Sequence, residues 1–217
     1  MFIDTSKGTL YNCRMNSITA YYHEELGNLA KIAAGYPFRA AVDALPGGDV
    51  AVLQMANVNA DVGIDWAAVK HVALPSTRSV AFLEPGNVIF TTRGTRNFAV
   101  ALERVPSPAV CSPQFFVIHV RDPGTITPAF LAWQINQRPA QEYLQREATG
   151  SYILNIRREV IENLSIAIPP LAQQHAITKL ADAANGERAA LARLIINRNQ
   201  QLEAIALGLH RTGEAHT

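Results

Sequence analysis

Short apolar runs rich in β-branched and aromatic residues recur along the first 120 positions and predict strands. They span residues 50–55, 69–74, 87–92, 98–102 and 115–120. Breakers such as Pro46-Gly47-Gly48 and Pro85-Gly86 separate the runs. Since polar and apolar positions alternate poorly within them, we expect several strands to be buried on both faces or strongly curved.

Helical signals interrupt this pattern. Thr127-Pro128 predicts an N-cap and a first-turn proline for a helix over 129–136, and further short helices are predicted over 140–148 and 157–163. Together these elements predict an α+β domain with a curved β-sheet and short helices over residues 1–168.

After Pro169-Pro170 the pattern becomes helical almost to the end, so residues 169–217 are predicted to form one long coiled-coil helix. Its apolar seam follows the alternating three- and four-residue steps of a heptad repeat. The seam comprises Ile177, Ala181, Ala184, Arg188, Leu191, Ile195, Arg198, Leu202, Ile205 and Leu209. Over this length, on the order of 50 Å, the helix needs a second helix, from its own domain or another chain, to cover the seam.

Two features complicate the seam. Asn185-Gly186 is a candidate break, although the heptad phase continues through it and favours a continuous rod. Arg188 and Arg198 lie symmetrically about position 193. An antiparallel homodimer that crosses at this position would therefore set the two like charges opposite each other. Glu187, Glu203 or a shifted register would relieve this repulsion. The alternative is a helix that packs back on its own domain.

Composition narrows the class of protein. The chain has 217 residues, of which 48% are hydrophobic and 17% charged, a composition that favours a folded chain with a sizeable core over disorder. Nineteen basic residues face eighteen acidic ones, which argues against a non-specific nucleic-acid coat but not against a sequence reader within a complex. Fifteen of the basic residues are arginine, which suits bidentate recognition of guanine or phosphate, although a GC-rich genome explains this bias equally well.

The usual signatures of catalysis and export are missing. The two cysteines suggest no disulfide framework, and we find no signal peptide and no apolar run of the roughly 18 residues that a membrane span requires. The six histidines lack metal-ligand spacing, and no phosphate loop, dinucleotide fingerprint or nucleophile elbow occurs. We therefore expect a cytoplasmic protein that is not an enzyme and binds no metal or cofactor of its own.

The junction over 164–177 resembles a known family. Its apolar strand, proline pair, glutamine-centred turn and long helix are similar to those of the DNA-specificity subunit of type I restriction–modification systems. Gln173 or Gln174 stands at the family's glutamine position, although a glutamine replaces the glutamate that usually precedes it. Segments 26–38, 50–58, 85–94 and 149–156 resemble further family motifs in the same order.

Complete specificity subunits carry two target-recognition domains and two long helices, whereas this chain resembles one of each. The resemblance implies a non-catalytic half-subunit that reads one half of a bipartite double-stranded DNA target. It further implies three kinds of protein partner: a second copy or another half-subunit, methyltransferase subunits that bring S-adenosylmethionine, and a restriction/translocase subunit. The alternative is a scaffold or antirestriction protein that binds methyltransferase subunits through its helix without reading DNA.

The candidate DNA contacts gather in the polar turn over 91–97, which offers Thr92, Arg93, Thr95, Arg96 and Asn97. Arginine reads guanine and asparagine reads adenine in the major groove, while hydroxyls hold phosphates. An ordinary polar hairpin turn is the alternative. Tyr36 and Arg39 form a second candidate, in which the aromatic ring is equally a core residue, and Arg78 is a third. Ser151-Tyr152, near Arg157-Arg158, is a fourth candidate, which we expect to be structural because the family that this chain resembles uses that loop to join domain and helix.

Overall fold

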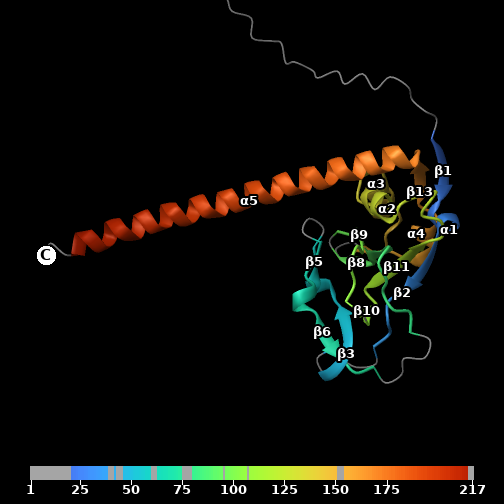
Figure 1. Ribbon diagram of the computed structural model, residues 1–217, viewed down its shortest axis with the longest axis horizontal. Coiled ribbons are helices and arrows are strands. Elements are labelled where there is room, and N and C mark those ends of the chain that lie inside the picture. Colours follow the sequence, from blue (N-terminus) through green and yellow to red (C-terminus); the bar gives the residue numbers. More distant parts are fainter. Residues whose placement is uncertain are drawn as a thin grey trace, which may run out of the picture.

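Four antiparallel strands form the central sheet of the computed structural model, in the order β2-β11-β7-β9 (Figure 1). They are β2 (Ala30–Ala34), β11 (Phe115–Val120), β7 (Asn87–Thr91) and β9 (Ala99–Ala101). The structure describes residues 21–38, 42, 46–59, 63–74, 80–94, 96–106, 108–150 and 154–214.

Strand β7 explains why the predicted strands alternate poorly. All five of its residues are buried. Val88 and Phe90 belong to the hydrophobic core on one face of the sheet, whereas Ile89 belongs to the core on the other face. A strand covered on both sides needs apolar side chains at successive positions, so the expectation of doubly buried strands is confirmed.

A second, mixed sheet lies beside the first in the order β10-β3-β6. It consists of β3 (Pro46–Leu53), β6 (Lys70–Val72) and β10 (Ala109–Cys111), with β10 parallel to β3. The chain passes from one sheet to the other at Gly35, whose amide donates a hydrogen bond to the Phe115 carbonyl. A Cβ atom at Gly35 would lie 2.0 Å from the carbonyl oxygen of Ser112, so only glycine fits here. The predicted strands are therefore present but divide between two main sheets.

Short strand pairs and turns complete the domain. Strand β1 pairs with β13, β8 with β12 and β4 with β5, all antiparallel. The bounds of these strands are β1 (Tyr22–Glu25), β13 (Ser165–Ile168), β8 (Arg93–Gly94), β12 (Leu154–Asn155), β4 (Val58–Asn59) and β5 (Gly63–Ile64). The one-turn elements are α1 (Leu26–Leu29), η2 (Met55–Asn57) and η3 (Trp66–Ala68).

Short helices cover one face of the central sheet: α2 (Pro128–Ile135), α3 (Arg138–Glu147) and α4 (Arg158–Glu162). Helix α2 begins as predicted, since the Thr127 hydroxyl accepts a hydrogen bond from the Phe130 amide and Pro128 occupies the first turn. Phe130, Leu131 and Ile135 of α2 are buried in the core beneath. The predicted α+β fold is confirmed.

The chain ends in one helix, α5 (Leu171–Glu214), which leaves the domain as a straight rod (Figure 1). Its 44 residues correspond to a length of about 66 Å. The helix is continuous through Asn185-Gly186, and nothing lies within 4 Å of where a Gly186 Cβ would be. Among the described residues, no helix is long and apolar enough to cross a membrane.

A single side chain fixes the start of this rod. Gln174 is fully buried, and its amide nitrogen donates 2.9 Å hydrogen bonds to the carbonyls of Thr125 and Pro169. Its side-chain oxygen accepts a hydrogen bond of 2.9 Å from the Thr127 amide. Gln174 thus ties α5 to the N-cap of α2 and to the proline pair. Its neighbour Gln173 donates instead to the Tyr21 hydroxyl, so the two candidate glutamines have different partners.

Candidate nucleic-acid and partner-helix interfaces

Arg93 lies at the end of the central sheet, where β8 pairs with β12 and sets it opposite Asn155. The Arg93 Nε donates a hydrogen bond of 3.4 Å to the Asn155 Oδ1. This contact orients the guanidinium through Nε and leaves its two terminal nitrogens for other acceptors. Gly94 follows with φ of +152°, a conformation that favours glycine. The result is an exposed arginine fork on a short backbone ribbon.

Asn155 and Arg157 form the other half of this edge, whereas the expected connector Ser151-Tyr152 lies outside the described residues. The Ile156 amide donates to the Thr92 carbonyl at 2.9 Å, which holds β12 against the turn. Arg157 follows and is exposed, with no ion pair to any described residue. Arg158 instead pairs with Glu162 at 2.7 Å within α4. Sequence reasoning missed the role of Asn155, although it had already matched that position to a polar turn of the family.

Two members of the predicted turn face inward. Thr92 is 6% exposed and its hydroxyl donates to the Gln114 carbonyl at 3.0 Å, while Asn97 is 3% exposed and its Nδ2 donates to the Thr91 carbonyl at 2.7 Å. Buried side chains that satisfy backbone carbonyls brace the turn and do not present their amide or hydroxyl to a base edge. For these two residues we correct the prediction from DNA contact to support of the turn.

The remaining predicted contacts separate in space. Tyr36 is half-buried and packs edge-on against Phe38 with ring centroids 4.7 Å apart, so its ring belongs to a third hydrophobic cluster of the domain. This is the alternative that the sequence left open for Tyr36. Arg39, Arg78 and Thr95 lie outside the described residues.

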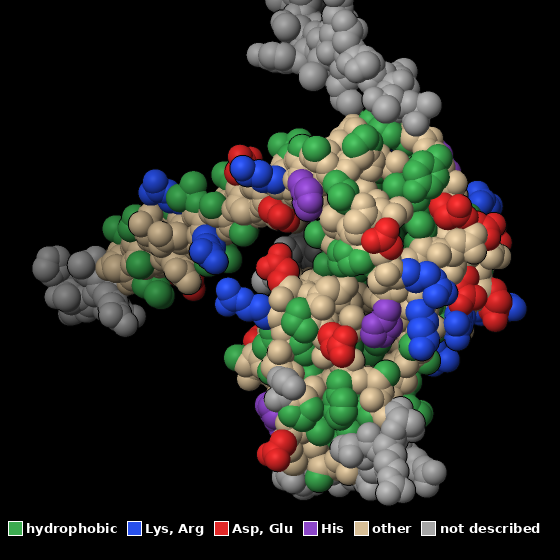
Figure 2. Space-filling model, turned by 45° about the vertical axis from the view of Figure 1, so that its right-hand side comes forward, with side chains coloured by type: hydrophobic (Ala, Val, Ile, Leu, Met, Phe, Trp, Pro, Cys, Tyr) green, Lys and Arg blue, Asp and Glu red, His purple; other side chains and the backbone are tan. Residues whose placement is uncertain are grey.

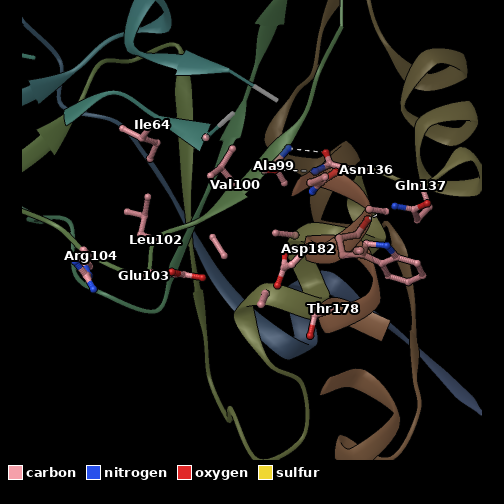
Figure 3. Close-up of a pocket in the computed structure, with 18 of the residues that line it drawn as sticks. Ile64, Ala99, Val100, Leu102, Glu103, Arg104, Asn136, Gln137, Thr178 and Asp182 are labelled. Atoms are coloured by element: carbon pink, nitrogen blue, oxygen red, sulfur yellow. Dashed lines mark hydrogen bonds between the residues drawn. The ribbon is translucent and has the colours of Figure 1, made fainter. Parts of the chain in front are cut away.

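Arg96 lines a cleft of about 900 Å³ between the domain and the first part of α5. The domain wall includes Val100, Leu102, Glu103 and Arg104, and the floor includes Trp133 of α2 and Asn136, which follows that helix. Glu103 and Asp182 extend into this space from its two sides (Figure 3). The space-filling view shows it as a hollow beneath the rod with acidic and basic side chains at its rim (Figure 2). Arg93 and Arg96 of the predicted turn therefore lie in different places, Arg93 beside Asn155 and Arg96 at the cleft.

The seam of α5 divides into two parts. Ile177, Ala181 and Ala184 are partly buried near the domain. Every described side chain from position 186 to 209 is exposed. The large exposed seam residues are Leu191 (60%), Ile195 (61%), Leu202 (65%), Ile205 (61%) and Leu209 (70%). The alternative of a helix packed on its own domain thus holds only for the first third, and the rest of the seam is uncovered.

Burial shifts the pKa values of Cys111 and His119 in the core of the domain. Burial raises the pKa of Cys111 to about 12, so this thiol stays protonated. Burial also lowers the pKa of His119, which lies 3.2 Å from the Asn87 amide nitrogen. Among the described residues, no three His, Cys, Asp or Glu side chains gather as metal ligands.

Comparison with solved structures identifies the fold, a β-rich domain that ends in one long helix. The S subunit of a type I restriction–modification system from M. genitalium superposes with a TM-score of 0.57 at 17% identity, over 86% of this chain. The HsdS subunit from Thermoanaerobacter tengcongensis superposes with a TM-score of 0.59 at 18% identity, over 82% of this chain. A chain from a structure that describes complex assembly and conformational transition of the type I R-M system superposes with a TM-score of 0.61 at 17% identity, over 89% of this chain.

The likeness covers 45% of each of these three neighbours, so this chain spans less than half of their length. Neither a family model nor a curated protein sequence matches it. At these identities the comparison establishes the fold: the chain is folded like one half of a type I S subunit.

Proposed function

We propose that the chain is a non-catalytic DNA-specificity component of a type I restriction–modification system, which reads one half of a bipartite target. The observation that carries this proposal is the agreement of domain and helix together with S subunits, over 82% to 89% of the chain. In this proposal residues 1–168 contact DNA and residues 169–217 pair with a second helix and dock methyltransferase subunits. The assembly would act in the cytoplasm, where the methyltransferase subunits supply S-adenosylmethionine and a restriction/translocase subunit supplies cleavage.

The proposed DNA contact is the edge formed by Arg93, Asn155 and Arg157. A guanidinium held through Nε presents its remaining donors as a fork, which matches the O6 and N7 acceptors of guanine or two phosphate oxygens. Arg157 adds a second cation from the neighbouring strand segment. Since the formal net charge of the whole chain is only +1, affinity has to come from such placed arginines and from partner subunits.

Replacing Arg93 with alanine is expected to weaken specific binding by about 1–3 kcal/mol, roughly 5- to 150-fold, because one bidentate contact is lost. The measurement is a gel-shift titration of the complex reconstituted with methyltransferase subunits, on target and non-target duplexes. Arg158→Ala is the matched control, since its guanidinium is already paired with Glu162. Normal binding by the Arg93 variant would remove this edge from the interface.

The same titration separates the proposal from the alternative of a scaffold or antirestriction protein. A specificity component makes the reconstituted complex prefer one duplex sequence over others. A scaffold leaves the complex without any such preference, whichever arginine is replaced.

Pairing is the second part of the proposal. The uncovered seam over 188–209 exposes five large apolar side chains, and a second helix of the same kind buries them with matching spacing. We propose an antiparallel pair centred near position 193, with a second copy of this chain as the partner. Another half-subunit with the same seam is the alternative partner, and sedimentation of the purified chain distinguishes the two.

A further inference from the structure

We propose that Glu203 of a second copy enters the cleft between α5 and the domain, where it pairs with Arg188 and faces Arg96 and Arg104. This inference rests on the antiparallel pairing proposed above and adds a specific contact to it. The contact would fix the register of the two helices and tie each helix to the domain of the other copy.

Asn185 and Glu203 lie on one face of α5. Asn185 lines the cleft, so its face of the helix looks toward the domain. Glu203 follows 18 residues later, which is five full turns of an α-helix, and it therefore lies on the same face as Asn185. In the free chain this face of the distal helix has no domain beneath it, and Glu203 is exposed.

The two-fold symmetry of an antiparallel pair brings Glu203 beside the cleft of the other copy. A two-fold axis across the helix pair at position 193 brings residue 203 of one helix level with residue 183 of the other, since both are ten residues from the centre. Position 183 lies in the middle of the stretch of α5 that borders the cleft, from Thr178 to Arg188. The axis also keeps the Asn185 face of both helices on the same side. Glu203 of the second copy therefore points into the cleft of the first.

The charged side chains that border the cleft favour an incoming carboxylate. The cleft is bordered by three arginines, Arg96, Arg104 and Arg188, and by only two carboxylates, Glu103 and Asp182. None of these five forms an ion pair within the described part of the chain, and Arg188 donates only to the Asn185 side chain. One incoming carboxylate balances the excess positive charge.

The same geometry resolves the like-charge problem of the seam. Arg198 follows Arg188 by ten residues, about 80° short of three full turns, so the two side chains lie on opposite edges of the seam. In the pair, Arg188 therefore turns toward the cleft and Arg198 of the partner turns away from it. Of the two acids named from the sequence, Glu203 is the one placed to meet Arg188. Glu187 lies about 100° away from Arg188 around the helix.

The proposed contact can be tested because Arg188 and Glu203 of the same chain are too far apart to touch. Arg188 and Glu203 are fifteen residues apart on a continuous helix, about 22 Å, so they cannot touch without a second copy. Each single reversal, Arg188→Glu or Glu203→Arg, is expected to weaken dimerisation about tenfold in sedimentation equilibrium at low salt. The double reversal is expected to restore most of the wild-type affinity, and the rescue is expected to vanish at 1 M salt because the contact is ionic.

The matched control is Glu187→Arg combined with Arg188→Glu. It exchanges the same two charges between neighbouring residues of one helix, of which Glu187 lies outside the proposed contact. We therefore expect this double variant to give no rescue. Circular dichroism confirms that each variant keeps the helix. Additive losses in the Arg188/Glu203 double reversal would overturn this contact while leaving a dimer, and hence the pairing, intact. A wild-type chain that stays monomeric would overturn the pairing and the contact together.

Discussion

Replacement of Gln174 with alanine lowers the free energy of unfolding by on the order of 3 kcal/mol, because it leaves one amide and two carbonyls without their partner inside the protein. The three groups are the Thr127 amide and the carbonyls of Thr125 and Pro169. They lie where α2 begins and where the chain enters α5, so both the core beneath α2 and the direction of the rod depend on them. The measurement is urea denaturation followed by the fluorescence of Trp133, which is packed against the same core.

Gln200→Ala is the matched control, since Gln200 is an exposed glutamine in the same helix and its loss is expected to change stability by less than about 0.5 kcal/mol. Gln174→Glu tests the polar character of the site separately. It keeps the length of the side chain but removes the donor to two carbonyls, so it is expected to destabilise at least as much as alanine. A Gln174→Ala variant as stable as wild type would mean that water replaces all three hydrogen bonds.

Introducing a charge at Leu202 is expected to abolish self-association while leaving the domain folded. Leu202 is 65% exposed in the single chain, so Leu202→Asp costs little there. In an antiparallel pair the two-fold axis places it opposite Ala184, a small residue that leaves room for it. Burial of one leucine stabilises the dimer by about 1.5–3 kcal/mol, and each dimer contains two such sites. The dissociation constant of the dimer is therefore expected to rise by a factor of about 10² to 10⁴.

Sedimentation velocity against concentration measures this change. Ala204→Asp is the control, because Ala204 is also exposed on α5 but lies about 160° around the helix from Leu202 and away from the face of Glu203. Equal losses from both variants would show that association uses the apolar surface of α5 without the predicted seam. Far-UV circular dichroism and the thermal midpoint of the domain are expected to stay unchanged in both variants.

The hydrophobic pattern predicted the individual elements but not how they assemble. The strands over 87–92 and 115–120 and the helix after Thr127 were predictable, since their signals are local: apolar runs, breakers and an N-cap. The division into two sheets was not, because it depends on the close approach of Gly35 to Ser112, nearly eighty residues away. The short strands β8 and β12 are each two residues long, too short to leave a periodic signal.

The roles of the candidate site residues likewise depend on contacts that are distant along the chain. The turn over 91–97 was located correctly as a polar turn at a strand end, but its side chains looked equivalent in sequence. Their roles separate only through partners distant along the chain: Gln114 holds Thr92, and Asn155 orients Arg93. Arg96, three residues from Arg93, borders a cleft made largely by α5. By contrast, the sequence alone predicted which residues share one face of α5, since helical periodicity is fixed by the helix itself and is independent of tertiary contacts.

The measurement that tests the central claim most directly is the selection of bound duplexes from a random DNA pool by this chain reconstituted with a type I modification subunit. A two-fold pair of identical readers predicts an inverted repeat: two short half-sites of the same sequence in opposite orientation, separated by a spacer of fixed length. Two different half-sites at a fixed spacing would keep the reading function but replace the second copy with another half-subunit. No enriched sequence at all would contradict the claim that this chain reads DNA.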